Sequence, residues 1–100
     1  MLGLTEFTTS HLVHLAQLID KPGTNVTMGQ IARAKAQASL CAREVAALAR
    51  EVCGGNGILV QNRVMKHFYD IEVMYTGEGT YDINSMLSAR EITGGLSAFK

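Results

Sequence analysis

Apolar residues recur along this chain at the three- and four-residue spacing of amphipathic helices, and no segment alternates convincingly with period two. Two predicted helices flank the only proline, Pro22. The first has its apolar positions at Leu4, Phe7, Leu12, Leu15, Leu18 and Ile19. The second covers residues 28 to about 53, because Thr27 and Gln30 have the spacing of a capping box and the segment after them is rich in alanine.

Two shorter helices are predicted in the second half of the chain. The glycine-rich stretch at residues 54–57 ends the long helix. A third helix is predicted over about residues 62–74, and a fourth over about residues 81–93, before Gly94 and Gly95. With no internal repeat and only short connections, the pattern predicts an all-α fold, an antiparallel helical bundle.

The composition narrows the class of function. Hydrophobic residues make up 47% of the chain and charged residues 18%, so we expect apolar surface that something outside this chain covers. The formal net charge of zero argues against a nucleic-acid partner and against a polybasic membrane anchor. No apolar run is long enough for a membrane span, and residues 1–20 lack the features of a targeting segment.

The two cysteines are predicted to be free thiols. Cys41 and Cys53 fall on one predicted helix, about 18 Å apart along its axis, which is beyond the reach of a disulfide. This indicates a reducing compartment.

Glu78 is the most informative candidate for chemistry. It lies between Gly77 and Gly79, directly before a predicted helix. Glycines permit unusual backbone conformations and the close approach of a ligand, and a helix N-terminus offers unpaired N–H groups and partial positive charge. The segment could therefore present a base and stabilise an anion beside it. The alternative is a surface turn with an incidental glutamate.

The other candidates are weaker. Residues 54–57 hold more glycine than a helix end requires, which suggests close approach by a phosphate or by another backbone, although a plain cap and turn is the alternative. The stretch matches neither a phosphate-binding loop nor a dinucleotide fingerprint. His11 and His14 could share a helix face, but no further ligands follow at metal-binding spacing, so no metal site is predicted.

Taken together, the two glycine-bearing segments resemble the C-terminal part of the acyl-CoA dehydrogenase family. Residues 51–58 are similar to that family's helix-ending flavin motif, and Glu78-Gly79-Thr80 follow at the family's interval. The closing stretches at residues 82–84, 89–94 and 98–100 are similar to the glutaryl-CoA dehydrogenase branch and to the plant peroxisomal short-chain acyl-CoA oxidases within it.

The resemblance implies α,β-dehydrogenation of a short or dicarboxylic acyl-CoA, such as glutaryl-CoA, with FAD as the cofactor. Glu78 matches the base that removes the α-proton, and Gly79 matches a residue that lines the substrate. The implied contacts with FAD are Glu51, Val52, Cys53, Gly54, Gly55, Thr80, Tyr81, Asp82 and Phe99. Those at residues 51–55 would reach the FAD of a neighbouring subunit. Gly77 stands where the family usually has Tyr, which predicts a less rigidly held base.

The resemblance also implies a setting for the chain. The family assembles as a homotetramer and passes electrons to an electron-transfer flavoprotein or to oxygen. Its members work in the mitochondrial matrix or peroxisome of eukaryotes, or in the bacterial cytoplasm. Residues 1–100 would be a C-terminal helical domain missing its first helix, with the N-terminal helical and middle β domains absent, and inactive when isolated. The competing hypothesis is a non-catalytic helical assembly module or an inactive fragment.

Overall fold

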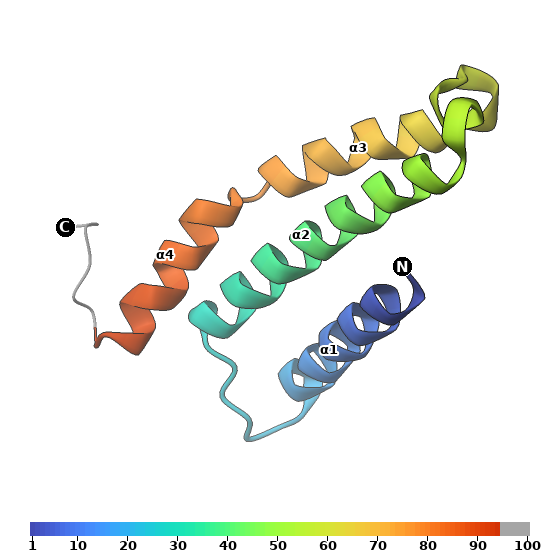
Figure 1. Ribbon diagram of the computed structural model, residues 1–100. Helices are drawn as coiled ribbons and strands as arrows, with labels where there is room; N and C mark the ends of the chain where they lie inside the picture. Colours follow the sequence, from blue (N-terminus) through green and yellow to red (C-terminus); the bar gives the residue numbers. More distant parts are fainter. Residues whose placement is uncertain (95–100) are drawn as a thin grey trace.

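The computed structural model describes residues 1–94, and these form helices without a strand (Figure 1). The helices are α1 (Leu2–Asp20), α2 (Met28–Val52), α3 (Val64–Thr76) and α4 (Tyr81–Ile92), with the 3-10 segments η1 (Gly54–Ile58) and η2 (Val60–Asn62) between α2 and α3. The prediction of an all-α fold is confirmed.

The ends of α3 differ from the prediction by two residues. Asn62 is the last residue of η2, and its side-chain amide donates to the Asn56 carbonyl at 2.8 Å. Arg63 after it takes a left-handed conformation with φ of 58°, so α3 begins only at Val64. At the other end, α3 continues through Tyr75 and Thr76. The break between α3 and α4 therefore falls at residues 77–80.

Helix α2 is the centre of the molecule. α1 runs antiparallel along one side of it, while α3 and α4 follow each other along the other side (Figure 1). The Cα radius of gyration is 16.3 Å and the extents are 49 × 32 × 18 Å. A compact chain of this length would have a radius of gyration of about 13 Å. The helices thus form a flat layer.

The buried apolar core is small. Within residues 1–94 it consists of Ala32, Ala34, Ala36 and Cys41, all on α2, and no large side chain is fully buried. The small residues let neighbouring helices approach α2 closely. Many large apolar side chains are exposed instead, among them Leu2, Phe7, Val52, Val60, Tyr69, Val73 and Ile92. Residues 1–94 therefore expose the extensive apolar surface that the composition of the chain predicts.

The start of α2 is fixed by the predicted capping box and by a residue of α4. The Thr27 hydroxyl accepts from the Gln30 N–H at 3.3 Å, and the Gln30 side chain accepts from the Thr27 N–H at 2.9 Å, so the capping box is confirmed. The Glu91 carboxylate accepts from the Thr27 hydroxyl at 2.7 Å and from the Gly29 N–H at 2.8 Å. A negative charge at a helix N-terminus is favourable, and Glu91 thereby ties α4 to α2.

We expect Glu91→Gln to lower the free energy of unfolding of the chain at pH 7. We also expect this variant to lose less of that free energy than the unaltered chain when the pH is lowered. The Thr27 hydroxyl lowers the pKa of Glu91 most, against some desolvation, and the Gly29 N–H and the charge of Arg33 lower it further. A carboxyl with a lowered folded pKa stabilises the fold above its ordinary value of 4.5, and this contribution disappears as the pH falls through the folded pKa.

The measurement is the urea midpoint by circular dichroism at pH 7 and pH 3. The difference between the two pH values should shrink in Glu91→Gln and stay unchanged in the control, Glu6→Gln, on the exposed surface of α1. An equal difference in both variants would show that the contacts of Glu91 do not stabilise the fold.

Candidate functional site

The loop that joins α3 to α4 places Glu78 between two helix ends. Gly77 caps α3, and its N–H donates to the Val73 carbonyl at 2.7 Å. Glu78 and Gly79 both take left-handed conformations, with φ of 57° and 96°. Thr80 then caps α4, because its hydroxyl accepts from the Ile83 N–H at 3.3 Å. The backbone thus passes from the end of α3 to the start of α4 within four residues, 77–80.

The conformation of Glu78 is unusual for a residue with a side chain. A left-handed conformation costs about 1–2 kcal/mol for such a residue, and it persists only where the surroundings fix it. Strained residues of this kind cluster at functional sites. The Glu78 side chain is exposed, and it has no hydrogen-bond partner within residues 1–94. Its carboxylate is therefore available to an external molecule.

Two side chains from outside the loop hold its backbone. The Lys35 ammonium on α2 donates to the Gly79 carbonyl at 2.6 Å and to the Tyr75 carbonyl at 3.1 Å. The Asn84 amide on α4 donates to the Gly79 carbonyl at 2.9 Å and to the Thr80 carbonyl at 3.1 Å. Asn84 is 6% exposed. Sequence interpretation did not single out Lys35 or Asn84.

Gly79 is required by both conformation and space. Its φ of 96° is unfavourable for any residue with a Cβ. A Cβ at this position would also lie 2.8 Å from the Asn84 side-chain nitrogen. Gly77, in contrast, has φ of −66° and ψ of 150°, which other residues adopt freely.

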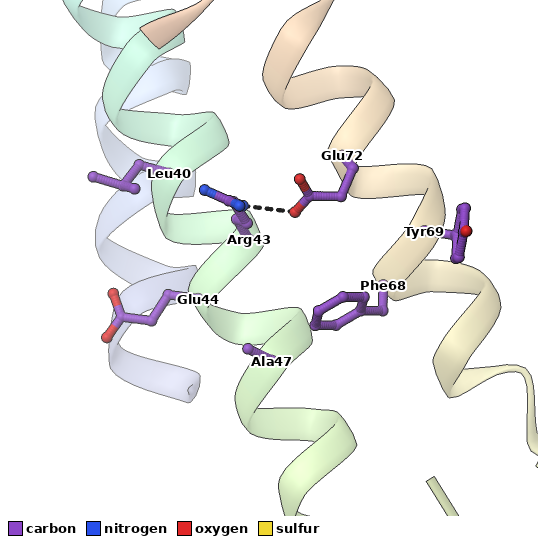
Figure 2. A pocket seen from close by; sticks show the side chains of 7 residues that line it. All are labelled: Leu40, Arg43, Glu44, Ala47, Phe68, Tyr69 and Glu72. Atoms are coloured by element: carbon purple, nitrogen blue, oxygen red, sulfur yellow. Dashed lines mark hydrogen bonds and ion pairs between the residues drawn. The ribbon is translucent and has the colours of Figure 1, made fainter. Parts of the chain in front are cut away.

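Aromatic rings flank the loop. Tyr75 and Tyr81 stack with their centroids 6.3 Å apart and their planes 11° from parallel. The Arg43 guanidinium lies 4.6 Å from the centroid of Tyr75, and its pKa is raised by the hydrogen bond and charge of Glu72, 2.6 Å away. This ion pair joins α2 to α3 (Figure 2). Tyr81 is half-buried, so its ring packs partly within the chain itself.

A shallow groove lies beside this ion pair. It is lined by Leu40, Arg43, Glu44, Ala47, Phe68, Tyr69 and Glu72 and has a volume of about 760 Å³. Figure 2 shows the Phe68 ring pointing from α3 toward Ala47 on α2, whereas Tyr69 points away from α2. The groove is an open contact region between the two helices.

The second predicted cluster, Glu51–Gly55, lies at the C-terminal end of α2 and the start of η1. All five residues are exposed. Gly54 has φ of 55°, and nothing lies within 4 Å of where a Cβ would stand at Gly54 or Gly55. At Gly57 a Cβ would collide with the Arg50 carbonyl. The chain's own backbone thus accounts for the close approach at Gly57, while Gly54 and Gly55 remain open to other molecules.

The two clusters are not adjacent. Helix α3 has 13 residues and is therefore about 20 Å long. It runs from the end near η1 to the loop that holds Glu78 (Figure 1). The structure brings together the predicted residues at 78–82 and, separately, those at 51–55. Phe99 lies outside the described residues.

Other predicted features can be placed as well. Cys41 is buried and Cys53 exposed, and both are free thiols. No group of three or more His, Cys, Asp or Glu residues within residues 1–94 is arranged to hold a metal ion. In the same part of the chain, no helix has both the length and the apolar character needed to cross a membrane.

Comparison with known families extends over almost the whole chain. Residues 1–93 match the family model for the acyl-CoA dehydrogenase C-terminal domain. The match includes all four α-helices and both clusters described above.

Proposed function

The chain belongs to the acyl-CoA dehydrogenase family, and we propose that it supplies the catalytic base, Glu78, to an FAD-dependent acyl-CoA dehydrogenase or oxidase. One observation carries the proposal. Within the matched region, an exposed carboxylate is held in a strained conformation at the loop that leads into α4. On this proposal the substrate is a short or dicarboxylic acyl-CoA of the kind that the glutaryl-CoA branch uses.

Glu78 would take the α-proton of the acyl-CoA thioester. General-base catalysis requires the carboxylate to lie within reach of that proton. Because Glu78 is exposed in this chain, other parts of the enzyme must cover it and exclude water from the reacting groups. Backbone N–H groups at the start of α4 that have no partner within residues 1–94 would stabilise negative charge that develops on the thioester oxygen. FAD, when bound, would accept the β-hydrogen as a hydride.

The residues proposed to contact FAD fit a cofactor with many hydrogen-bonding groups. The open backbone at Gly54 and Gly55 lets an extended molecule approach closely. Thr80, the exposed residue that caps α4, has a polar side chain, and Asp82 in the first turn of α4 can accept a hydrogen bond from a hydroxyl of the cofactor.

We assign the two clusters to cofactor sites that are shared between subunits. Glu51–Gly55 lie about 20 Å from the Glu78 loop along α3, so they do not line the surroundings of Glu78 itself. On this proposal they contact the FAD of a neighbouring subunit in a homotetramer. The enzyme would pass electrons to an electron-transfer flavoprotein or to oxygen, in the mitochondrial matrix, the peroxisome or a bacterial cytoplasm.

A second candidate is a non-catalytic helical assembly module. Its support is the small core of α2 together with the large apolar side chains exposed on every helix. Such a chain would complete a helical assembly and contribute no chemistry.

A chimera distinguishes the two candidates. Residues 1–100 would replace the corresponding segment of a full-length glutaryl-CoA dehydrogenase. We expect the purified chimera to carry FAD, measured by flavin absorbance, and to oxidise glutaryl-CoA or another short acyl-CoA. A tetrameric, FAD-loaded chimera with no turnover on these substrates would contradict the catalytic proposal and favour the module.

We expect Gly77→Tyr to raise the turnover number of the chimera. The backbone at Gly77 is open to other residues, although its Cβ would lie 3.1 Å from the Val73 carbonyl and require a small shift. A ring beside Glu78 would restrict the motion of the base. Gly77→Ala is the matched control, because it adds the Cβ without the ring. An unchanged turnover number in Gly77→Tyr would show that the position does not limit how firmly Glu78 is held.

A further inference from the structure

We infer that Lys35 and Asn84 act together as positioning residues for Glu78, by fixing the peptide unit that follows Gly79. The inference rests on the proposed function of Glu78 for its catalytic consequence. Its structural basis is independent, because both side chains donate to the same carbonyl oxygen, that of Gly79.

The two donors approach the loop from different helices. Lys35 lies on α2 and Asn84 on α4, and they meet at Gly79, one residue after Glu78. Hydrogen bonds from a charged donor are roughly twice as strong as neutral ones. A carbonyl that accepts from both helices cannot rotate without breaking both contacts. The peptide after Gly79 is thus fixed relative to both α2 and α4.

Lys35 also closes the loop from its other end. Its ammonium donates to the Tyr75 carbonyl in the last turn of α3 as well as to the Gly79 carbonyl. A cation at a helix C-terminus is favourable. One ammonium therefore joins the two ends of the segment 75–79, and Glu78 lies within that segment.

The surroundings of Lys35 explain why its ammonium is held there. Its neighbours in sequence, Ala34 and Ala36, are buried, and Lys35 itself is half-buried. A charge taken out of water needs partners, and the contacts found for this ammonium are the two loop carbonyls. The buried Asn84 amide is in a similar position, because its nitrogen donates to the carbonyls of Gly79 and Thr80.

The strained backbone conformation of Glu78 explains why these hydrogen bonds are needed. A left-handed glutamate beside a left-handed glycine has other conformations to relax into. Conformations of this kind persist only when the surrounding structure over-determines them. Within residues 1–94, Lys35 and Asn84 are the side chains that donate hydrogen bonds to the Gly79 carbonyl, next to Glu78. Without them, the loop should sample several conformations.

The first test is the order of the loop in the full chain, measured by ¹⁵N relaxation. In Lys35→Met we expect the order parameters at Glu78 and Gly79 to fall from about 0.85 to below about 0.6, while those of α2 and α4 stay unchanged. Lys66→Met, which removes an ammonium from the exposed face of α3, is the matched control and should leave the loop ordered. Asn84→Leu keeps Lys35 and should also loosen the loop. An ordered loop in both Lys35→Met and Asn84→Leu would overturn the inference.

The second test uses the chimera. If the base is held by Lys35, Lys35→Met should lower kcat about 10²-fold through misplacement of the carboxylate, with KM unchanged, and Lys35→Arg should restore part of kcat. A loss expressed in KM alone would show that Lys35 does not position the base.

The positioning role of Lys35 and Asn84 and the catalytic role of Glu78 can be rejected independently of each other. If Lys35→Met loosens the loop but the chimera has no activity, the positioning role of Lys35 and Asn84 stands and the catalytic role of Glu78 is rejected. If Lys35→Met keeps full kcat while Glu78→Gln is inactive, Glu78 stands as the base and the positioning role is rejected.

Discussion

Glu78→Gln is expected to lower the turnover number of the FAD-loaded chimera by about 10²–10⁴-fold, the usual contribution of a general base. Gln has the size of Glu and keeps a polar side chain, so it should preserve the loop and the binding of acyl-CoA. It cannot accept the α-proton at neutral pH. The measurement is the rate at which the flavin absorbance bleaches after anaerobic mixing with the acyl-CoA.

Two controls sharpen this result. Glu44→Gln makes the same change on the exposed face of α2 and should leave the rate unchanged. Glu78→Gly should abolish turnover as well, but it should raise the free energy of unfolding by about 1 kcal/mol, because glycine takes the left-handed conformation without strain. A Glu78→Gln chimera that bleached its flavin at the unaltered rate would remove Glu78 from the proposed reaction.

Gly79→Ala is expected to lower the free energy of unfolding of the full chain by about 2–5 kcal/mol. Part of this is conformational, since a left-handed backbone costs about 1–2 kcal/mol for alanine. The rest arises because the new Cβ would displace Asn84, and a buried amide that loses its partners costs about 1–3 kcal/mol. Urea unfolding, followed by circular dichroism, measures the change.

The chain offers matched glycine controls for this prediction. Gly54 also has a positive φ, but nothing lies within 4 Å of its absent Cβ, so Gly54→Ala should show only the conformational part. Gly55 has no positive φ and the same open surroundings, so Gly55→Ala should be nearly neutral. Equal losses in Gly79→Ala and Gly54→Ala would show that the contact with Asn84 does not contribute.

Much of the fold could be predicted because its signals are local. The capping box of Thr27 and Gln30 places the start of α2, and the glycines after Cys53 place its end. The apolar spacing of each segment gives its helical type. Glu78 could be singled out for the same reason, since its two glycine neighbours are visible in the sequence.

The contacts that hold the loop could not be predicted in this way. Lys35 is 44 residues from Gly79, and only the packing of α2 against α3 and α4 brings the two together. Nothing in an alanine-rich helix distinguishes a lysine that binds carbonyls from one on a solvated face. The hydrogen bonds of Asn84 could not be predicted from the sequence either. The same holds for the role of Gly57, because it depends on the contact with the Arg50 carbonyl.

The small core of α2 has a consequence for how this chain exists in solution. Its buried apolar residues within residues 1–94 are three alanines and a cysteine, and removing so little apolar area from water gives little free energy of folding. Any protein surface that binds only the folded helices therefore adds its binding energy to their stability by mass action. The melting temperature of this chain should rise with the concentration of whatever covers it, and the helices should exchange their amide protons more slowly once covered.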